Sequence, residues 1–182
     1  AILCLNMVIA ASGAMIIVNS VTIIQGFFNL SESELAIAML LYGIGAIVSA
    51  ILVFFISDKV NHRAIMLIGA FLTFIVSFAS AFIQSYSELL LLWACFGFAA
   101  TFILVPIGQL LREETNENDR TAIFGAQFSL SHACWLIAYP LLGYLFVIVG
   151  LKASFFIVAG IVLSSTLTAW FLWHSPKGKL FT

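Results

Sequence analysis

The chain has 182 residues, of which 63% are hydrophobic and only 8% charged, and its mean hydropathy is +1.18. Soluble domains carry about 25% charged residues, so this composition excludes a water-soluble domain and makes the lipid bilayer the expected surroundings. The net charge is −1, and the seven basic residues are scattered. This distribution excludes a nucleic-acid-binding surface, which needs clustered Lys and Arg.

Six charge-free runs divide the chain, and each is long enough to cross a membrane as a helix. The two shortest, 35–57 and 89–111, have 23 residues each and would measure roughly 35 Å as helices, against a hydrocarbon core of ~30 Å. Helices are favoured over transmembrane strands, because strands need alternating segments of about ten residues and runs such as 65–83 do not alternate. The sequence predicts an all-α membrane protein with a single bundle over 1–182 and six transmembrane helices, at about 2–29, 34–57, 64–85, 88–111, 122–149 and 153–173.

Two of the joints between these spans carry the chemistry that starts a helix. Serines stand just ahead of two glutamates: Ser31 or Ser33 before Glu34, and Ser85 or Ser87 before Glu88. A serine hydroxyl satisfies a free amide of the first turn, and a carboxylate is favoured at the positive end of the helix. Both glutamates are therefore predicted to be structural.

The basic residues fall mostly on one side of the predicted membrane. Six of the seven lie there: Lys59, Arg63, Arg112, Arg120, Lys177 and Lys179. Only Lys152 lies on the other side. By the positive-inside rule, loops 58–63 and 112–120 and both termini are expected to be cytoplasmic. The chain is predicted to be an integral multi-pass protein of the plasma membrane, which in a bacterium is the inner membrane.

The loop between the second and third spans reads Ser57-Asp58-Lys59-Val60-Asn61-His62-Arg63. It resembles the loop signature of the major facilitator superfamily, G-x-L-A-D-R-x-G-R-R/K. Two glycines of the signature are replaced, by Phe54 and by Asn61. The resemblance implies a gating loop whose charges hold the cytoplasmic gate of a transporter by ion pairs and helix-end contacts. Its residues are Asp58, Lys59, His62 and Arg63.

A segment of the fifth span, Trp135 to Tyr144, resembles a second family segment, G-x-x-x-G-P-x-x-G-G, of which it keeps Pro140 and Gly143. Six spans in this length resemble one half of a twelve-helix transporter. The N-terminal half usually carries R-x-x-Q-G-x-G in its fourth helix, whereas residues 88–98 contain no Arg. The resemblance therefore implies the C-terminal half, with the other six-helix half as partner. Residues 124–135 resemble, more faintly, bacterial exporters of the nickel-resistance branch.

The fifth span also has a histidine in the middle of its hydrophobic run. A stripe of mainly small and polar residues passes through it: Gly125, Ser129, His132, Leu136, Tyr139 and Gly143. His132 either donates a hydrogen bond to a neighbouring helix or lines the substrate pathway, where it can titrate or ligate a metal. Further candidate pathway residues are Asn19, Gln127 and Tyr139, although amides also join helices. Gly43, Gly45 and Gly97 are expected to permit close helix approach.

No motif for catalysis, for a cofactor or for a resident metal site is present in the sequence. The chain is therefore predicted not to be an enzyme and to need no cofactor. The predicted function is secondary active transport by alternating access, with efflux of a small solute or a metal ion. The alternative is a self-contained six-helix channel or small transporter that acts as an oligomer.

Overall fold

The computed structural model describes residues 1–175, and its regular elements in this part of the chain are all helices. In chain order they are α1 (Ile2–Ile17), the π-helix η1 (Thr22–Phe27), α2 (Glu32–Ile56), α3 (His62–Ser80), α4 (Tyr86–Glu114) and α5 (Glu117–His174). Four of them, α2 to α5, are long and apolar enough to cross a membrane, and α1 is a shorter apolar helix. The predicted all-helical fold is confirmed for the described residues.

The segment predicted as the first span, 2–29, contains two helices. α1 ends at Ile17, where the carbonyl oxygen of Ala14 accepts hydrogen bonds from the backbone N–H of Val18 (3.0 Å) and of Asn19 (3.3 Å). The side-chain amide of Asn19 points back to the same oxygen at 3.4 Å. Because one carbonyl takes several donors, the regular α-helical ladder is interrupted, and the chain continues in the wider turns of η1.

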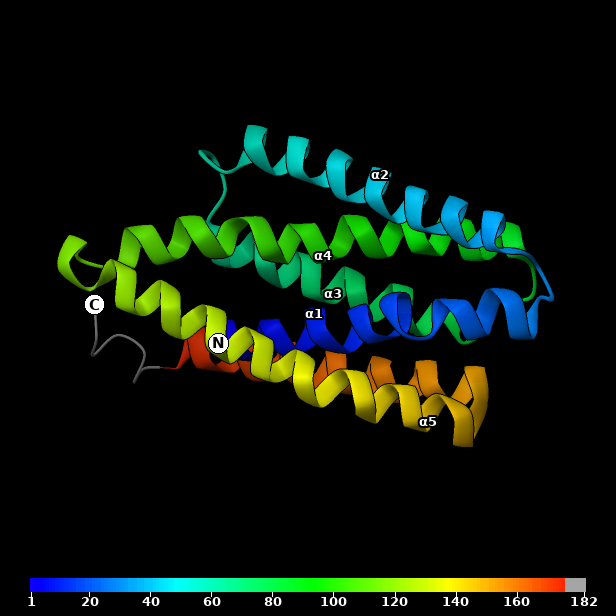
Figure 1. Ribbon diagram of the computed structural model, residues 1–182. Coiled ribbons are helices and arrows are strands. Elements are labelled where there is room, and N and C mark those ends of the chain that lie inside the picture. The colour runs from blue at the N-terminus through cyan, green and yellow to red at the C-terminus, as the bar shows by residue number, and fades with distance from the viewer. Residues whose placement is uncertain (176–182) are drawn as a thin grey trace.

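The fifth and sixth predicted segments both lie in α5, which turns back on itself at Gly150 (Figure 1). Gly150 has φ 74° and ψ −179°, a conformation that is essentially restricted to glycine. The two arms of α5, 117–149 and 151–174, therefore run in opposite directions. We call them the first and the second arm.

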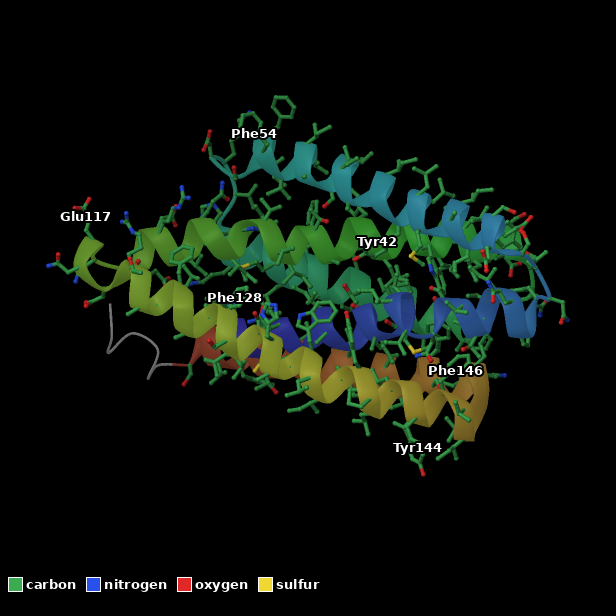
Figure 2. The ribbon with its side chains drawn as sticks, viewed as in Figure 1. Tyr42, Phe54, Glu117, Phe128, Tyr144 and Phe146 are labelled. Carbon is green, nitrogen blue, oxygen red and sulfur yellow. The ribbon has the colours of Figure 1, made fainter. Side chains whose placement is uncertain are left out.

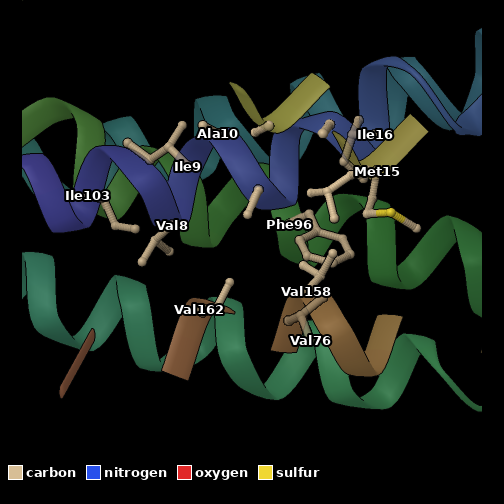
Figure 3. Close-up of a cluster of buried hydrophobic side chains, with 14 of the residues drawn as sticks. Val8, Ile9, Ala10, Met15, Ile16, Val76, Phe96, Ile103, Val158 and Val162 are labelled. Atoms are coloured by element: carbon tan, nitrogen blue, oxygen red, sulfur yellow. The ribbon is translucent and has the colours of Figure 1, made fainter. Parts of the chain in front are cut away.

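The helices pack in neighbouring pairs, with α2 on α4, α1 on α5, and α3 on both α4 and α5. In Figure 1, α3 lies behind α4, and the second arm of α5 lies behind the first. Apolar side chains from α1, α3, α4 and α5 meet between these layers, where Figure 3 shows Val8, Val76, Phe96 and Val158 among them. In a membrane, the close van der Waals packing of this shared cluster stabilises the bundle.

Large apolar side chains also cover the outside of the bundle. Phe54 of α2 is 73% exposed and Tyr144 of α5 is 68% exposed, and both point away from the other helices in Figure 2. Phe146, two residues after Tyr144, is only 7% exposed. An outer surface of this kind suits lipid or further helices and is unsuited to water.

Glycines set the spacing between α2 and α4. A Cβ atom at Gly45 would overlap the carbonyl oxygen of Ala94, and a Cβ atom at Gly97 would overlap the carbonyl oxygen of Tyr42. The prediction of close approach is confirmed for these two glycines. It is wrong for Gly43, whose added Cβ would meet no atom within 4 Å, because this residue lies on a face of α2 that is turned away from α4.

The described basic residues are divided unequally between the two ends of the bundle. Four of them lie at the end formed by 57–63 and 112–120, which we call the basic end: Lys59, Arg63, Arg112 and Arg120. Lys152 lies at the opposite end, where its ammonium is 5.3 Å from the centre of the Phe82 ring. Lys177 and Lys179, which the sequence also predicts to lie on the cytoplasmic side, are outside the described residues.

Candidate functional site

The chain reverses direction between α2 and α3 within residues 57–61. The backbone N–H groups of Lys59 and Val60 donate to the carbonyl oxygen of Ile56 at 2.9 and 3.0 Å, which closes α2. Asn61 then starts α3, because its Oδ1 accepts a hydrogen bond from the backbone N–H of Arg63 at 2.8 Å. Asn61 thus acts as a helix cap where the family signature has a glycine, and His62 and Arg63 become the first two residues of α3.

The start of α3 meets the end of α4, because these two helices are packed antiparallel. His62 Nδ1 lies 3.2 Å from Glu113 Oε2, and the guanidinium of Arg63 forms an ion pair with Glu114. Two basic residues that begin one helix therefore face the two acidic residues that end the other. Within residues 1–175 these are the only close contacts between a basic and an acidic side chain.

The dipoles of the two helices make these contacts depend on how the helix ends are docked. A positive charge is disfavoured at the N-terminus of its own helix, and a negative charge at the C-terminus. Arg63, Glu113 and Glu114 each stand at the unfavourable end of their own helix but beside the favourable end of the neighbouring helix. The contacts are therefore stabilising only while the ends of α3 and α4 remain together.

A polar cavity of about 520 Å³ opens beside these pairs. It is lined by loop 57–63 and by Leu110, Glu113 and Glu114 of α4. Asp58 and Lys59 are exposed at its wall, and neither forms an ion pair within the described part of the chain. All four predicted gating residues are thus gathered around one cavity.

Glu113 and Glu114 are the site residues that the sequence analysis missed. From the sequence alone, loop 112–120 indicates only the orientation in the membrane, through Arg112 and Arg120. The signal that identifies the two glutamates is complementarity, since a basic pair begins the third predicted span and an acidic pair ends the fourth. Consecutive antiparallel helices bring these two positions to the same end of a bundle.

The predicted pathway residues lie away from the polar cavity, three of them (Gln127, His132 and Tyr139) on the first arm of α5 and Asn19 between α1 and η1. His132 and Tyr139 line a shallow groove of about 570 Å³, together with Ser129, Trp135 and Pro140. His132 Nδ1 is 2.8 Å from the carbonyl oxygen of Phe128, and the centres of the His132 and Phe128 rings are 4.0 Å apart. The polar contacts of His132 are therefore with its own helix, and its side chain is exposed on the surface of the bundle.

Asn19 and Gln127 do not line this groove. Asn19 is buried, and its amide is 3.4 Å from both the Ala14 carbonyl oxygen and the Met15 sulfur. Gln127 is half-buried on the first arm of α5. The structure thus brings together two of the four predicted pathway residues.

Residues 2–181 match the family model described as Major Facilitator Superfamily. The chain belongs to the major facilitator superfamily. The resemblance predicted from loop 57–63 and from the fifth span is therefore confirmed, and the chain is a member of a family of membrane transporters. A comparison with curated proteins found no match.

This member of the major facilitator superfamily has a tryptophan at the first glycine of the G-x-x-x-G-P-x-x-G-G segment, and a glycine on the facing helix makes room for it. Trp135 stands at the first glycine position of that segment. On the facing helix α1, a Cβ atom at Gly13 would be only 2.5 Å from the Trp135 ring. In this chain the glycine is on α1, at Gly13, and the indole of Trp135 occupies the space beside it.

Proposed function

We propose that the chain forms one six-helix half of a secondary transporter that works by alternating access. In this proposal α1 with η1, α2, α3, α4 and the two arms of α5 supply the six spans, at about the predicted boundaries. The family match over residues 2–181 and the apolar outer surface support it. In transporters of this kind two helix bundles rock against one another around a central binding site.

The observation that carries the mechanism is the paired basic and acidic doublets at the ends of α3 and α4. We infer that they form part of the cytoplasmic gate, with Asp58 and Lys59 available on the cavity wall to contact the second six-helix half. Helix ends that attract each other only when docked suit a gate, because separating them removes the attraction at once. The positive-inside rule supports a cytoplasmic position for the basic end and both termini.

The substrate pathway in this proposal passes the groove on the first arm of α5. His132 and Tyr139 are exposed or half-buried there and face out of the six-helix bundle, where a second bundle can enclose them. A neutral imidazole can ligate a metal ion and can also exchange a proton near neutral pH. The proposed direction of transport is export, of a small solute or a metal ion, and the resemblance of 124–135 to exporters supports it. Asn19 and Gln127 are further candidates for residues that line the substrate pathway.

The self-contained channel is the weaker alternative, because the family match favours a transporter. The two functions differ in what the 182 residues can do alone. If this chain, purified and monomeric in liposomes, moves a substrate by itself, the half-transporter proposal fails.

The gate is tested by thiol labelling in inside-out vesicles. A cysteine at Ala133, a residue of the α5 groove, is placed in a background with Cys4, Cys95 and Cys134 replaced by alanine. Glu114→Gln breaks the pair with Arg63 and should increase the labelling rate from the cytoplasmic side severalfold, because the gate opens more often. The double charge reversal Arg63→Glu with Glu114→Arg should restore the original rate.

Glu117→Gln is the matched control, since Glu117 is an exposed acid of the same loop that forms no ion pair within the described residues. It should leave the rate unchanged. Equal rates in Glu114→Gln and the parent protein, with equal amounts of folded protein, would refute the gate.

A further inference from the structure

A second cavity at the basic end lies on the outside of the bundle, between α3 and the second arm of α5. Its volume is about 690 Å³. The walls are apolar and include Leu67, Phe71 and Leu72 of α3 and Trp170 of α5. Phe71 and Trp170 are 52% and 44% exposed, so the cavity is open to whatever surrounds the protein.

The mouth of this cavity has a different chemistry from its walls. Arg63 lies there with its guanidinium carbon 6.0 Å from the centre of the Trp173 ring. His174 stacks on Trp170, and its Nδ1 is 2.8 Å from the Trp170 carbonyl oxygen, which leaves the other ring nitrogen available to a ligand. Among the described residues that line the cavity, none is acidic. The polar cavity on the other side of Arg63 has three acidic residues instead.

We propose that this cavity binds an anionic glycerophospholipid. The phosphate lies at Arg63 and His174, and an acyl chain lies along Leu67, Phe71, Leu72 and Trp170. Tryptophans are enriched at the level of the lipid headgroups, and basic pockets between transmembrane helices on the cytoplasmic side recognise anionic headgroups. An apolar wall capped by an arginine, a histidine and interfacial tryptophans is complementary to such a lipid along its whole length.

Arg63 also connects the lipid to the ion pair. Arg63 lines both cavities, and its guanidinium is paired with Glu114. Glu114 and a lipid phosphate therefore compete for the same donor groups. Removing the carboxylate should strengthen lipid binding, whereas removing the guanidinium should weaken it.

The test is quenching of tryptophan fluorescence by phospholipids with brominated acyl chains. Trp170 and Trp173 report on the cavity, Trp93 is fully buried, and Trp135 is replaced by phenylalanine. The protein is reconstituted in phosphatidylcholine vesicles that contain either brominated phosphatidylglycerol or brominated phosphatidylcholine. We expect phosphatidylglycerol to bind about fivefold more tightly than phosphatidylcholine, because Arg63 places one cationic side chain at the headgroup.

Two variants separate lipid binding from a structural role of the ion pair. Arg63→Gln should reduce the preference for phosphatidylglycerol towards one, and Glu114→Gln should increase it. Both break the same ion pair, so a purely structural effect would change both in the same direction. Lys152→Gln, at the opposite end of the bundle, should leave the preference unchanged. Equal quenching by the two lipids in the parent protein, or a preference retained in Arg63→Gln, would overturn the proposal.

Discussion

Single residues decide where the helices of this chain can bend and touch. Gly150 is the clearest case, because its positive φ lets the first arm of α5 turn into the second without an intervening loop. Asn19 acts through its side chain, whose amide competes with backbone N–H groups for the carbonyl oxygen of Ala14, so that α1 ends within an apolar stretch. In both cases one side chain, or its absence, changes the path of the backbone.

Replacing Gly150 by alanine should destabilise the protein by about 1–3 kcal/mol, because a side chain at this φ and ψ is strained. Gly160→Ala is the matched control in the second arm, where an added Cβ would meet no atom within 4 Å. We expect a lower thermal unfolding midpoint in detergent for Gly150→Ala, and an unchanged or higher midpoint for the control. Equal midpoints for the two variants would show that the turn does not depend on glycine.

At the scale of helices, the α2–α4 crossing is set by a reciprocal contact. Gly45 of α2 lies against the backbone of α4, and Gly97 of α4 lies against the backbone of α2. Neither helix can acquire a side chain at these points without moving away from the other. Where α2 and α4 begin, the Tyr86 hydroxyl also joins the two helices by donating a hydrogen bond to the Glu34 carbonyl oxygen at 2.8 Å.

Gly45→Ala and Gly97→Ala should each cost about 1–3 kcal/mol, because the added methyl group overpacks a backbone contact. Gly43→Ala, two residues away on the same helix, should be neutral or slightly stabilising. Unfolding midpoints in detergent measure the difference. A decrease for Gly43→Ala as large as that for Gly45→Ala would mean that glycine acts here through helix flexibility and not through contact.

The sequence predicted the helices better than their contacts. Charge-free runs indicate apolar helices directly, and the serines ahead of Glu34 and Glu88 correctly predicted capped helix starts. The structure selects Ser31 and Ser85 as the caps, each in a capping box with its glutamate. The rotation of each helix depends on its packing partners, so the sequence could not tell that Gly43 faces outward. For the same reason it could not establish that the polar contacts of His132 are with its own helix. The interruption near Asn19 is also a tertiary effect.

The whole molecule is asymmetric in where its lysines and arginines lie along the direction of its helices. Four of the five that the structure describes lie at the basic end and one, Lys152, at the opposite end, whereas acidic residues occur at both ends. This asymmetry favours one orientation during insertion, because Lys and Arg are retained on the cytoplasmic side. The polar cavity and the lipid-binding cavity proposed above both lie at the basic end, so orientation determines the compartment and the leaflet that each one faces.

Orientation can be tested with one cysteine at each end, in a background with Cys4, Cys95 and Cys134 replaced by alanine. Ser33→Cys and Asn118→Cys are suitable because both native residues are exposed in loops or first turns at opposite ends. In intact cells a membrane-impermeant maleimide should label Ser33→Cys and leave Asn118→Cys unlabelled. After permeabilisation both should react, which controls for accessibility. The reverse pattern would place loops 58–63 and 112–120 outside the cell, and the polar cavity could then form part of an external gate only.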